Sequence, residues 1–342
     1  MESLKKIAIY VCCLLGSAIA QTSCDSIDDD LSDCVKDYRV TLHVNTQVDD
    51  VLDARLYESD DQYIREALRE PLHNIFREEG HDLDIAFYAD DQKGDIEYHY
   101  YQDMQGARQA TYNLFFANFP YRNIAVANVG QEPTIDFADT LNCATAIITN
   151  RQATNAANGI IASQQSPLFT ARKQVFVPSN VDSTLCVDLY MANGAAVLVV
   201  DTTGVAVRDM RVYINGTASS FNLSDSTCTF TGSPTISTRR IDAQQRNEVA
   251  FMGLTLPSPM QPTRAGEDPE QGSYWSLSAY VDKLDGTTTE SIIYVRQPLH
   301  ADELLIIKAR LTPDGAIPAV DVNAGISIDL NWSEGGQWNP NF

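Results

Sequence analysis

Strict alternation of apolar and polar residues recurs along this chain, and it limits the possible folds more than any other feature. In residues 38–45, YRVTLHVN, the apolar side chains of Val40, Leu42 and Val44 fall on one side. Residues 276–294 contain two such runs around Asp285 and Gly286, the pattern of a hairpin with a tight turn. Because successive side chains of a strand point to opposite faces, these runs predict strands with one buried face. We therefore expect a mainly β protein.

The same pattern extends over most of the chain, with one interruption by a helix. LDIAFYADDQKGD and IEYHYYQDM form a second expected hairpin, and further strand-like runs follow up to GISIDLNW near the end. Residues 61–79 instead carry apolar residues at helical spacing, with Pro71 kinking or ending a first segment. Residues 139–165 show weak periodicity and are expected to form a long loop with at most a short helix.

The length of 342 residues fits about two domains. A restart of the strand pattern after SPLFTAR places the expected boundary near residues 166–170. We predict an N-terminal domain over 38–168 and a C-terminal domain over 169–342, both antiparallel β-sandwiches, with the helix in the first. Residues 24–37, which include DSIDDDLSD, are predicted to form an acidic tether.

The charge balance excludes one class of partner. Forty-six acidic and 24 basic residues give a net charge of -22. A surface of this sign repels nucleic acid and anionic lipid unless a basic patch is present, and the sequence contains none. We therefore expect no nucleic-acid partner.

The N-terminus, MESLKKIAIYVCCLLGSAIA, is typical of a signal peptide, with two lysines before an apolar run too short to span a bilayer. Cleavage after Ala20, in the small residue pattern Ala18-Ile19-Ala20, would release a secreted protein. Cleavage before Cys24, after Thr22 and Ser23, is typical of a bacterial lipoprotein and would leave Cys24 as the acylated N-terminus. In that case residues 1–23 are the signal, and more than one acyl chain makes the attachment durable.

The remaining cysteines leave two alternatives open. If Cys24 carries lipid, the mature cysteines are Cys34, Cys143, Cys186 and Cys228. An even number in an exported chain allows one or two disulfides, whereas the alternative is buried free thiols. No pair has the C-x-x-C spacing of a zinc or redox site.

Signatures of catalysis or of a metal centre are missing from the sequence. The five histidines have no metal-binding spacing, no G-x-S-x-G or Gly-rich phosphate loop occurs, and the acidic turns DSIDDDLSD and DKLDGTTTE depart from a calcium loop. Asn215 and Asn222 begin short N-glycosylation-like patterns that carry little information here. We expect neither an enzyme nor a cofactor.

Tryptophan offers one alternative binding chemistry. Aromatic faces stack on the apolar faces of sugars, so Trp275, Trp332 and Trp338 could form a platform for glycans. The competing interpretation is that Trp275 and Trp332 are core or interface residues of strands. A platform would indicate a surface lipoprotein that captures glycans for uptake.

Several motifs together resemble the fimbrillin-associated anchor family of Bacteroidetes, the lipid-anchored accessory subunits of fimbriae. CDSIDDDLSDC, residues 24–34, is similar to that family's lipidated cysteine followed by Asp-Asp-Leu-Ser-Asp-Cys. LDIAFYADDQKG, SPLFTAR and DLYMANGAAVLVV resemble later segments of the family more loosely. The sequence departs from the family in residues 121–124 and at Gln21.

The resemblance implies two transthyretin-like β-sandwich domains and acylation, including palmitate, at Cys24. It also implies a location on the outer membrane and a role in attaching a fimbrium and limiting its length. Its implied partner is a fimbrillin shaft subunit, joined by strand addition in which main-chain hydrogen bonds complete an open sheet edge. Residues 326–332 could be a last strand used in this way, or an ordinary edge strand of the second domain.

Overall fold

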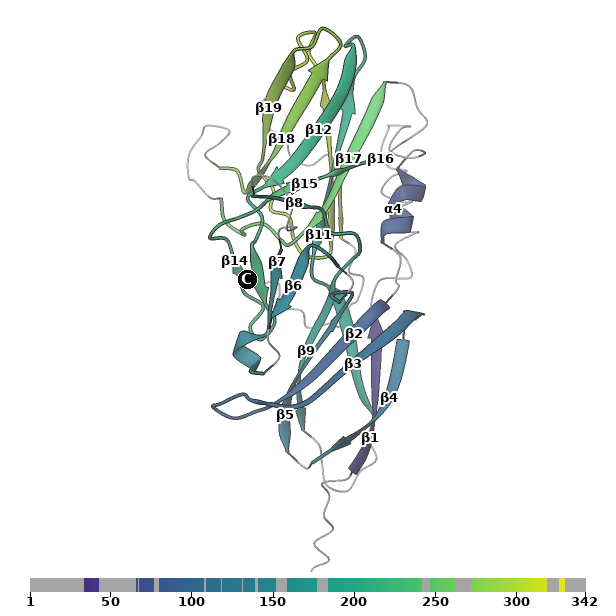
Figure 1. Cartoon of the computed structure of the whole chain (residues 1–342), viewed down its shortest axis with the longest axis vertical. Coiled ribbons are helices and arrows are strands. Elements are labelled where there is room, and N and C mark those ends of the chain that lie inside the picture. Colours follow the sequence, from purple (N-terminus) through teal and green to yellow (C-terminus); the bar gives the residue numbers. More distant parts are fainter. Residues whose placement is uncertain are drawn as a thin grey trace, which may run out of the picture.

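The computed structural model describes residues 34–42, 66, 68–76, 80–107, 109–117, 119–130, 132–138, 141–151, 159–176, 184–241, 247–262, 272–318 and 326–329. Figure 1 shows these residues as two β-sandwiches stacked along the long axis of the molecule. The predicted mainly β fold with two β-sandwiches and a helix is confirmed for this part of the chain, although three of the described strand pairs are parallel. The helix was expected in the first domain and instead packs on a sheet of the second sandwich.

A seven-stranded sheet forms the first sandwich by folding over on itself. Its layers meet at a corner where β9 and β10 share only two residue pairs, and Phe87 and Phe116 pack between them with ring centroids 4.5 Å apart. In sheet order the strands are β3 (Ile96–Ala107), β2 (Gly80–Ala89), β5 (Pro120–Ala127), β9 (Phe169–Phe176), β10 (Leu185–Met191), β1 (Cys34–Leu42) and β4 (Gln109–Phe116).

Two five-stranded sheets form the second sandwich, with Leu198, Val212 and Leu277 in the core between them. The first sheet contains β16 (Arg239–Ile241), β17 (Glu248–Thr255), β11 (Gly194–Asp201), β20 (Glu303–Arg310) and β21 (Ile326–Asp329). The second contains β19 (Thr288–Val295), β18 (Trp275–Lys283), β12 (Val207–Asn215), β15 (Thr235–Ser237) and β8 (Ile160–Ala162).

A helix covers the other face of the first of these sheets. α4 (Arg69–Ile75) lies beside β16 and β17 in Figure 1, and its Leu72 shares a buried cluster with Val197 and Met252. Because β11 is buried on both faces, its sequence is a continuous apolar run and does not alternate. Of the predicted helical range 61–79, Glu66 and α4 are helical, and residues 61–65, 67 and 77–79 lie outside the described residues. Pro71 lies in the first turn of α4, where no intrahelical N–H bond is lost.

A third, four-stranded sheet joins the two halves of the chain. It contains β14 (Cys228–Thr229), β13 (Ser220–Asn222), β7 (Ile147–Asn150) and β6 (Ile135–Ala138). Its Ile148 and Phe221 pack in one cluster with Tyr88 and Ile124, on the outer face of β2 and β5. The short 3-10 helix η2 (Cys143–Thr145) precedes β7.

Several local expectations change in the structure. The two predicted hairpins are confirmed as β2–β3 and β18–β19, with Gly286 at a positive φ of 86° in the second turn. The expectation of a loop over 139–165 is wrong where β7 and β8 lie, each paired to a strand from the second half, whereas the expected short helix is present as η2. The first strand begins at Cys34, four residues before Tyr38.

Sheet membership also differs from the expected division at residues 168 and 169. β9 and β10 follow that boundary in sequence but are hydrogen-bonded into the first sheet. The chain crosses to the second sandwich only between Met191 and Gly194. If the sheets define the domains, we propose that the first ends at this crossing.

Candidate functional site

The start of β1 marks the end of the molecule that is farthest from the second sandwich. Cys24 and residues 25–33 lie outside the described residues, so Cys34 is the first position the structure places. β1 runs parallel to β10, and β10 leads directly into β11 of the second sandwich. The beginning of β1 therefore points away from the second sandwich, as Figure 1 shows at the lower end of the molecule.

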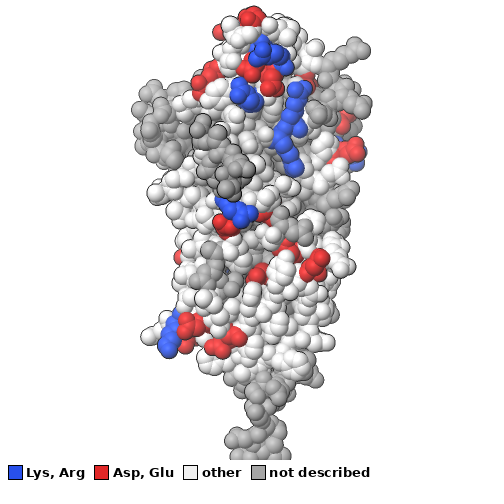
Figure 2. Space-filling model, in the orientation of Figure 1, with Lys and Arg blue, Asp and Glu red and all other residues white. Residues whose placement is uncertain are grey.

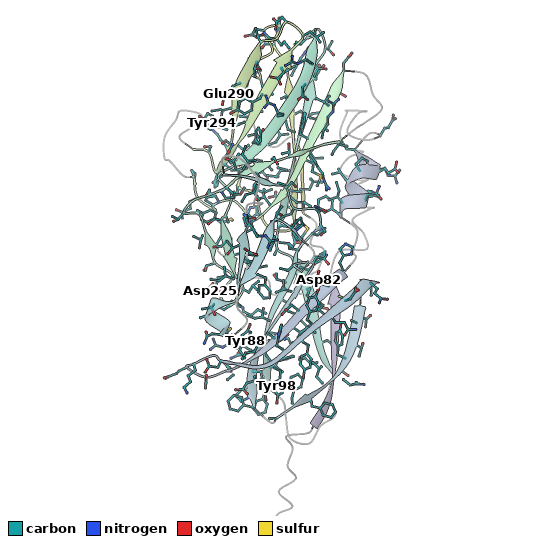
Figure 3. All side chains as sticks on the ribbon, viewed as in Figure 1. Asp82, Tyr88, Tyr98, Asp225, Glu290 and Tyr294 are labelled. Atoms are coloured by element: carbon teal, nitrogen blue, oxygen red, sulfur yellow. The ribbon has the colours of Figure 1, made fainter. Side chains whose placement is uncertain are left out.

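The opposite end of the molecule presents a free sheet edge. β19 pairs with β18 on one side, and no described strand pairs with its other side. The Lys283 N–H donates to the Thr287 carbonyl at 2.8 Å, which sets the alternation of backbone groups along the hairpin. On that alternation the N–H groups of Glu290, Ile292 and Tyr294 face away from β18. Glu290 and Tyr294 are labelled on this strand in Figure 3.

The last described strand is an ordinary edge strand. β21 pairs antiparallel with the first half of β20, from Ile326 opposite Ile306 to Asp329 opposite Glu303. It thus closes one edge of the second sandwich, in agreement with the second of the two interpretations of residues 326–332. Residues 330–332 lie outside the described part.

Three of the four expected mature cysteines can be placed, and all three are free thiols. Cys143 is buried, Cys186 is exposed on β10 and Cys228 is half-buried on β14. Burial raises the pKa of the Cys143 thiol and raises that of Cys228 to about 12. Cys186 is therefore the accessible thiol among these three. The side chain of Cys34 is not among those that the structure describes.

No group of three or more metal-ligating side chains converges within the described residues. His99 on β3 pairs with Asp84 on β2, with 2.8 Å between Nε2 and Oδ2. Burial is the main influence on Asp84 and raises the pKa of its carboxyl despite this partner. In the turn DKLDGTTTE, the Asp285 carboxylate accepts hydrogen bonds from the Thr287 N–H and hydroxyl, so it is used within the turn.

Trp275 cannot serve as a sugar platform. It is 2% exposed in the core of the second sandwich, and its indole N–H donates to the Gln297 carbonyl at 2.9 Å. Its interpretation as a core residue is confirmed. Trp332 and Trp338 lie outside the described residues.

A buried polar network at the crossing between the sandwiches was not predicted from the sequence. Asn193 is fully buried, and its side chain donates to Gln164 Oε1 at 2.6 Å and accepts from the Leu168 N–H at 3.2 Å. The nearby Glu132 carboxylate accepts from the Gln165 N–H at 2.7 Å. Such a network fixes the crossing because each buried polar group would be costly without its partner.

The carboxylate of Asp90 links three neighbouring strands at the end of β2. It accepts hydrogen bonds from Gln174 Nε2 of β9 at 2.7 Å and from Arg122 Nε of β5 at 2.6 Å. These two bonds, that of Gln174 first, hold the pKa of Asp90 below its usual value. A depressed pKa contributes stability above the unfolded pKa, and this contribution is lost as the pH falls through the folded value.

We expect Asp90→Asn to lower the free energy of unfolding by at most about 1 kcal/mol near pH 7, because the pair is partly solvated. The difference from the parent should shrink as the pH falls below about 4, where the carboxyl of the parent becomes protonated. Urea unfolding at pH 7 and at pH 3 measures both values. A difference of equal size at the two pH values would contradict the assigned role of the charge.

The chain is similar to known proteins in structure and not in sequence. No protein-family model matches it, and no curated protein is similar to it. A candidate adhesin from Bacteroides thetaiotaomicron has a TM-score of 0.52 at 11% identity, over 86% of this chain and 97% of its own. Candidate polysaccharide binding proteins from the same organism give a TM-score of 0.51 at 11% identity, over 84% of this chain and 99% of their own.

The fimbrial anchor protein Mfa2 from Porphyromonas gingivalis gives a TM-score of 0.48 at 12% identity, over 86% of this chain and 100% of its own. At these identities the likeness concerns the fold. The expected resemblance is therefore confirmed at that level: this chain shares its fold with a candidate adhesin and with candidate polysaccharide binding proteins of Bacteroides thetaiotaomicron.

Proposed function

We propose that this protein is a lipid-anchored outer-membrane subunit that attaches a fimbrium to the cell surface and regulates its assembly or length. The observation that carries the proposal is the position of two features at opposite ends of the molecule. The strand that follows the Cys24 tether begins at one end, and the free edge of β19 lies at the other. A chain held by its first end would present the second to a partner outside the membrane.

The edge of β19 suits the addition of a strand from a shaft subunit. It is eight residues long, and no described strand pairs with its outer side. Ser291, Ile293 and Val295 point into the core and hold the strand in place. A peptide that pairs with such an edge gains main-chain hydrogen bonds in series, while side-chain contacts select the partner.

Ile292 provides the test of this contact. Ile292→Pro removes an outward N–H without removing a hydrogen bond to β18, and proline is tolerated on an edge strand. Pull-down of the parent from native membranes should bring a fimbrillin-like shaft subunit with it, and Ile292→Pro should reduce the captured amount about tenfold. The matched control Ile292→Ala keeps the amide and should retain most of the capture.

Two outcomes would count against the proposal. Capture of no shaft subunit by the parent would contradict the fimbrial role. Equal capture by the parent and Ile292→Pro would place the contact elsewhere than β19. The alternative function, glycan capture, cannot use Trp275 as a platform because this residue is buried. Only tight binding of a polysaccharide in a titration would support that function.

A further inference from the structure

Three phenylalanine side chains are exposed at the end of the molecule where β1 begins. Phe115 is 54% exposed, Phe119 40% and Phe176 69%. A single exposed apolar side chain needs no explanation, but several large ones at one end of a molecule indicate an interaction surface. We call these three residues the phenylalanine pole.

Strand pairing places the three residues together at this end. Phe115 of β4 is the pairing partner of Val35, the second residue of β1. Phe176 is the last residue of β9 and the partner of Pro120, which directly follows Phe119. All three therefore lie where the strands of the first sandwich end, on the side where the tether enters.

The rings point outward from different sides of this end. Phe115 is exposed between Leu114 and Phe116, which are both buried in the core, so it projects from the outer face of its layer. Phe176 projects in the same way from the other layer, next to the buried Val175. The Phe119 ring lies in the turn between them, 5.7 Å from that of Tyr121. An arrangement around a tip suits a broad surface better than a single peptide groove.

The tether limits what this tip can meet. Nine residues separate Cys24 from Cys34, and a chain of that length reaches at most about 30 Å when fully extended. An acylated Cys24 would thus keep the phenylalanine pole close to the bilayer at all times. In the face shown in Figure 2, a group of acidic and basic residues lies at the lower left, and the tip below it is formed by other residues.

We propose that the phenylalanine pole inserts into the interfacial region of the bilayer that holds Cys24, an inference that rests on the proposed lipid anchor. Aromatic and apolar side chains bury part of their surface at the boundary between headgroups and acyl chains. The tether keeps the phenylalanine pole at a high local concentration at the bilayer surface. A contact too weak to bind membranes alone therefore becomes effective. The contact orients the molecule with its second sandwich away from the membrane.

Energy transfer measures this orientation on the acylated full chain in vesicles of phosphatidylethanolamine and phosphatidylglycerol. A donor dye is attached to the exposed Cys186, in a Cys34→Ser background, and acceptor dyes are placed on lipid headgroups. In Phe115→Ser/Phe176→Ser the body should move away on its tether, and the transfer efficiency should fall about twofold or more. Because the contact is apolar, raising the salt concentration to about 0.5 M should not reduce the transfer efficiency of the parent.

A matched control removes apolar surface from the opposite end. Leu284→Ser changes a side chain that is 68% exposed in the second sandwich, and its efficiency should equal that of the parent. Thermal unfolding of each variant verifies the fold. Equal transfer in the parent and the phenylalanine variant, with both floating with the vesicles, would overturn this inference alone. Failure of the parent to float would overturn the lipid anchor and this inference with it.

Discussion

Replacing Cys24 with alanine is expected to move nearly all of the protein from the membrane fraction to the soluble fraction. None of the described helices is long and apolar enough to cross a membrane. The attachment proposed above is through acyl chains on Cys24. Each buried methylene of an acyl chain contributes about 0.8 kcal/mol, and two or more chains give durable binding. The phenylalanine pole cannot replace them, because its contact is effective only while the tether holds it near the surface.

Fractionation followed by quantitative detection of the protein measures this change. Cys186→Ala is the matched control, because it removes an exposed thiol on β10 and leaves the anchor intact. Retention of the Cys24→Ala variant in the membrane fraction would contradict acylation at this residue. A soluble parent would instead support cleavage after Ala20, the alternative for the N-terminus.

Gly194→Ala is expected to destabilise the whole fold by about 2–3 kcal/mol. Gly194 opens β11 directly after the crossing between the sandwiches, and a Cβ added there would lie 2.4 Å from the backbone oxygen of His300. A main-chain oxygen cannot rotate away, so β11 or the segment before β20 would have to shift. That shift would also disturb the buried Asn193, whose hydrogen bonds hold the crossing.

Gly253→Ala is the control, with a different kind of neighbour. An added Cβ there would lie 2.5 Å from Cδ1 of Ile214, the end of a side chain that can change its rotamer. We expect a loss of about 1 kcal/mol or less for this variant. Thermal and urea unfolding measure both changes. Equal losses for the two glycines would refute the argument that the backbone contact at Gly194 is the cause.

Local patterns were sufficient where the partner of a strand is its neighbour in sequence. The alternation in residues 276–294 and the Asp285-Gly286 turn predicted the hairpin of β18 and β19, because a hairpin needs only local information. The core position of Trp275 followed from the same alternation. The acidic segment after Cys24 and the family resemblance of CDSIDDDLSDC could also be recognised from the sequence alone.

The strands that the sequence did not predict are those whose pairing partners lie far away in the sequence. β7 and β8 are four and three residues long, and each pairs with a strand from the other half of the chain, β13 and β15. The same holds for β10, which pairs with β1 although β2 to β9 lie between them in sequence, and therefore for the point at which the chain changes sandwich.

The sequence by itself thus determined the class of fold, the hairpins and the N-terminal segment that points to a lipid anchor. Only the tertiary structure decided which edge stays open and which phenylalanines gather where the tether enters. Phe115, Phe119 and Phe176 lie in different strands and a turn, and their exposure depends on how two layers end at one tip. Period-two alternation assigns a side chain to a face of its own strand, whereas the long-range pairing of strands decides what that face meets.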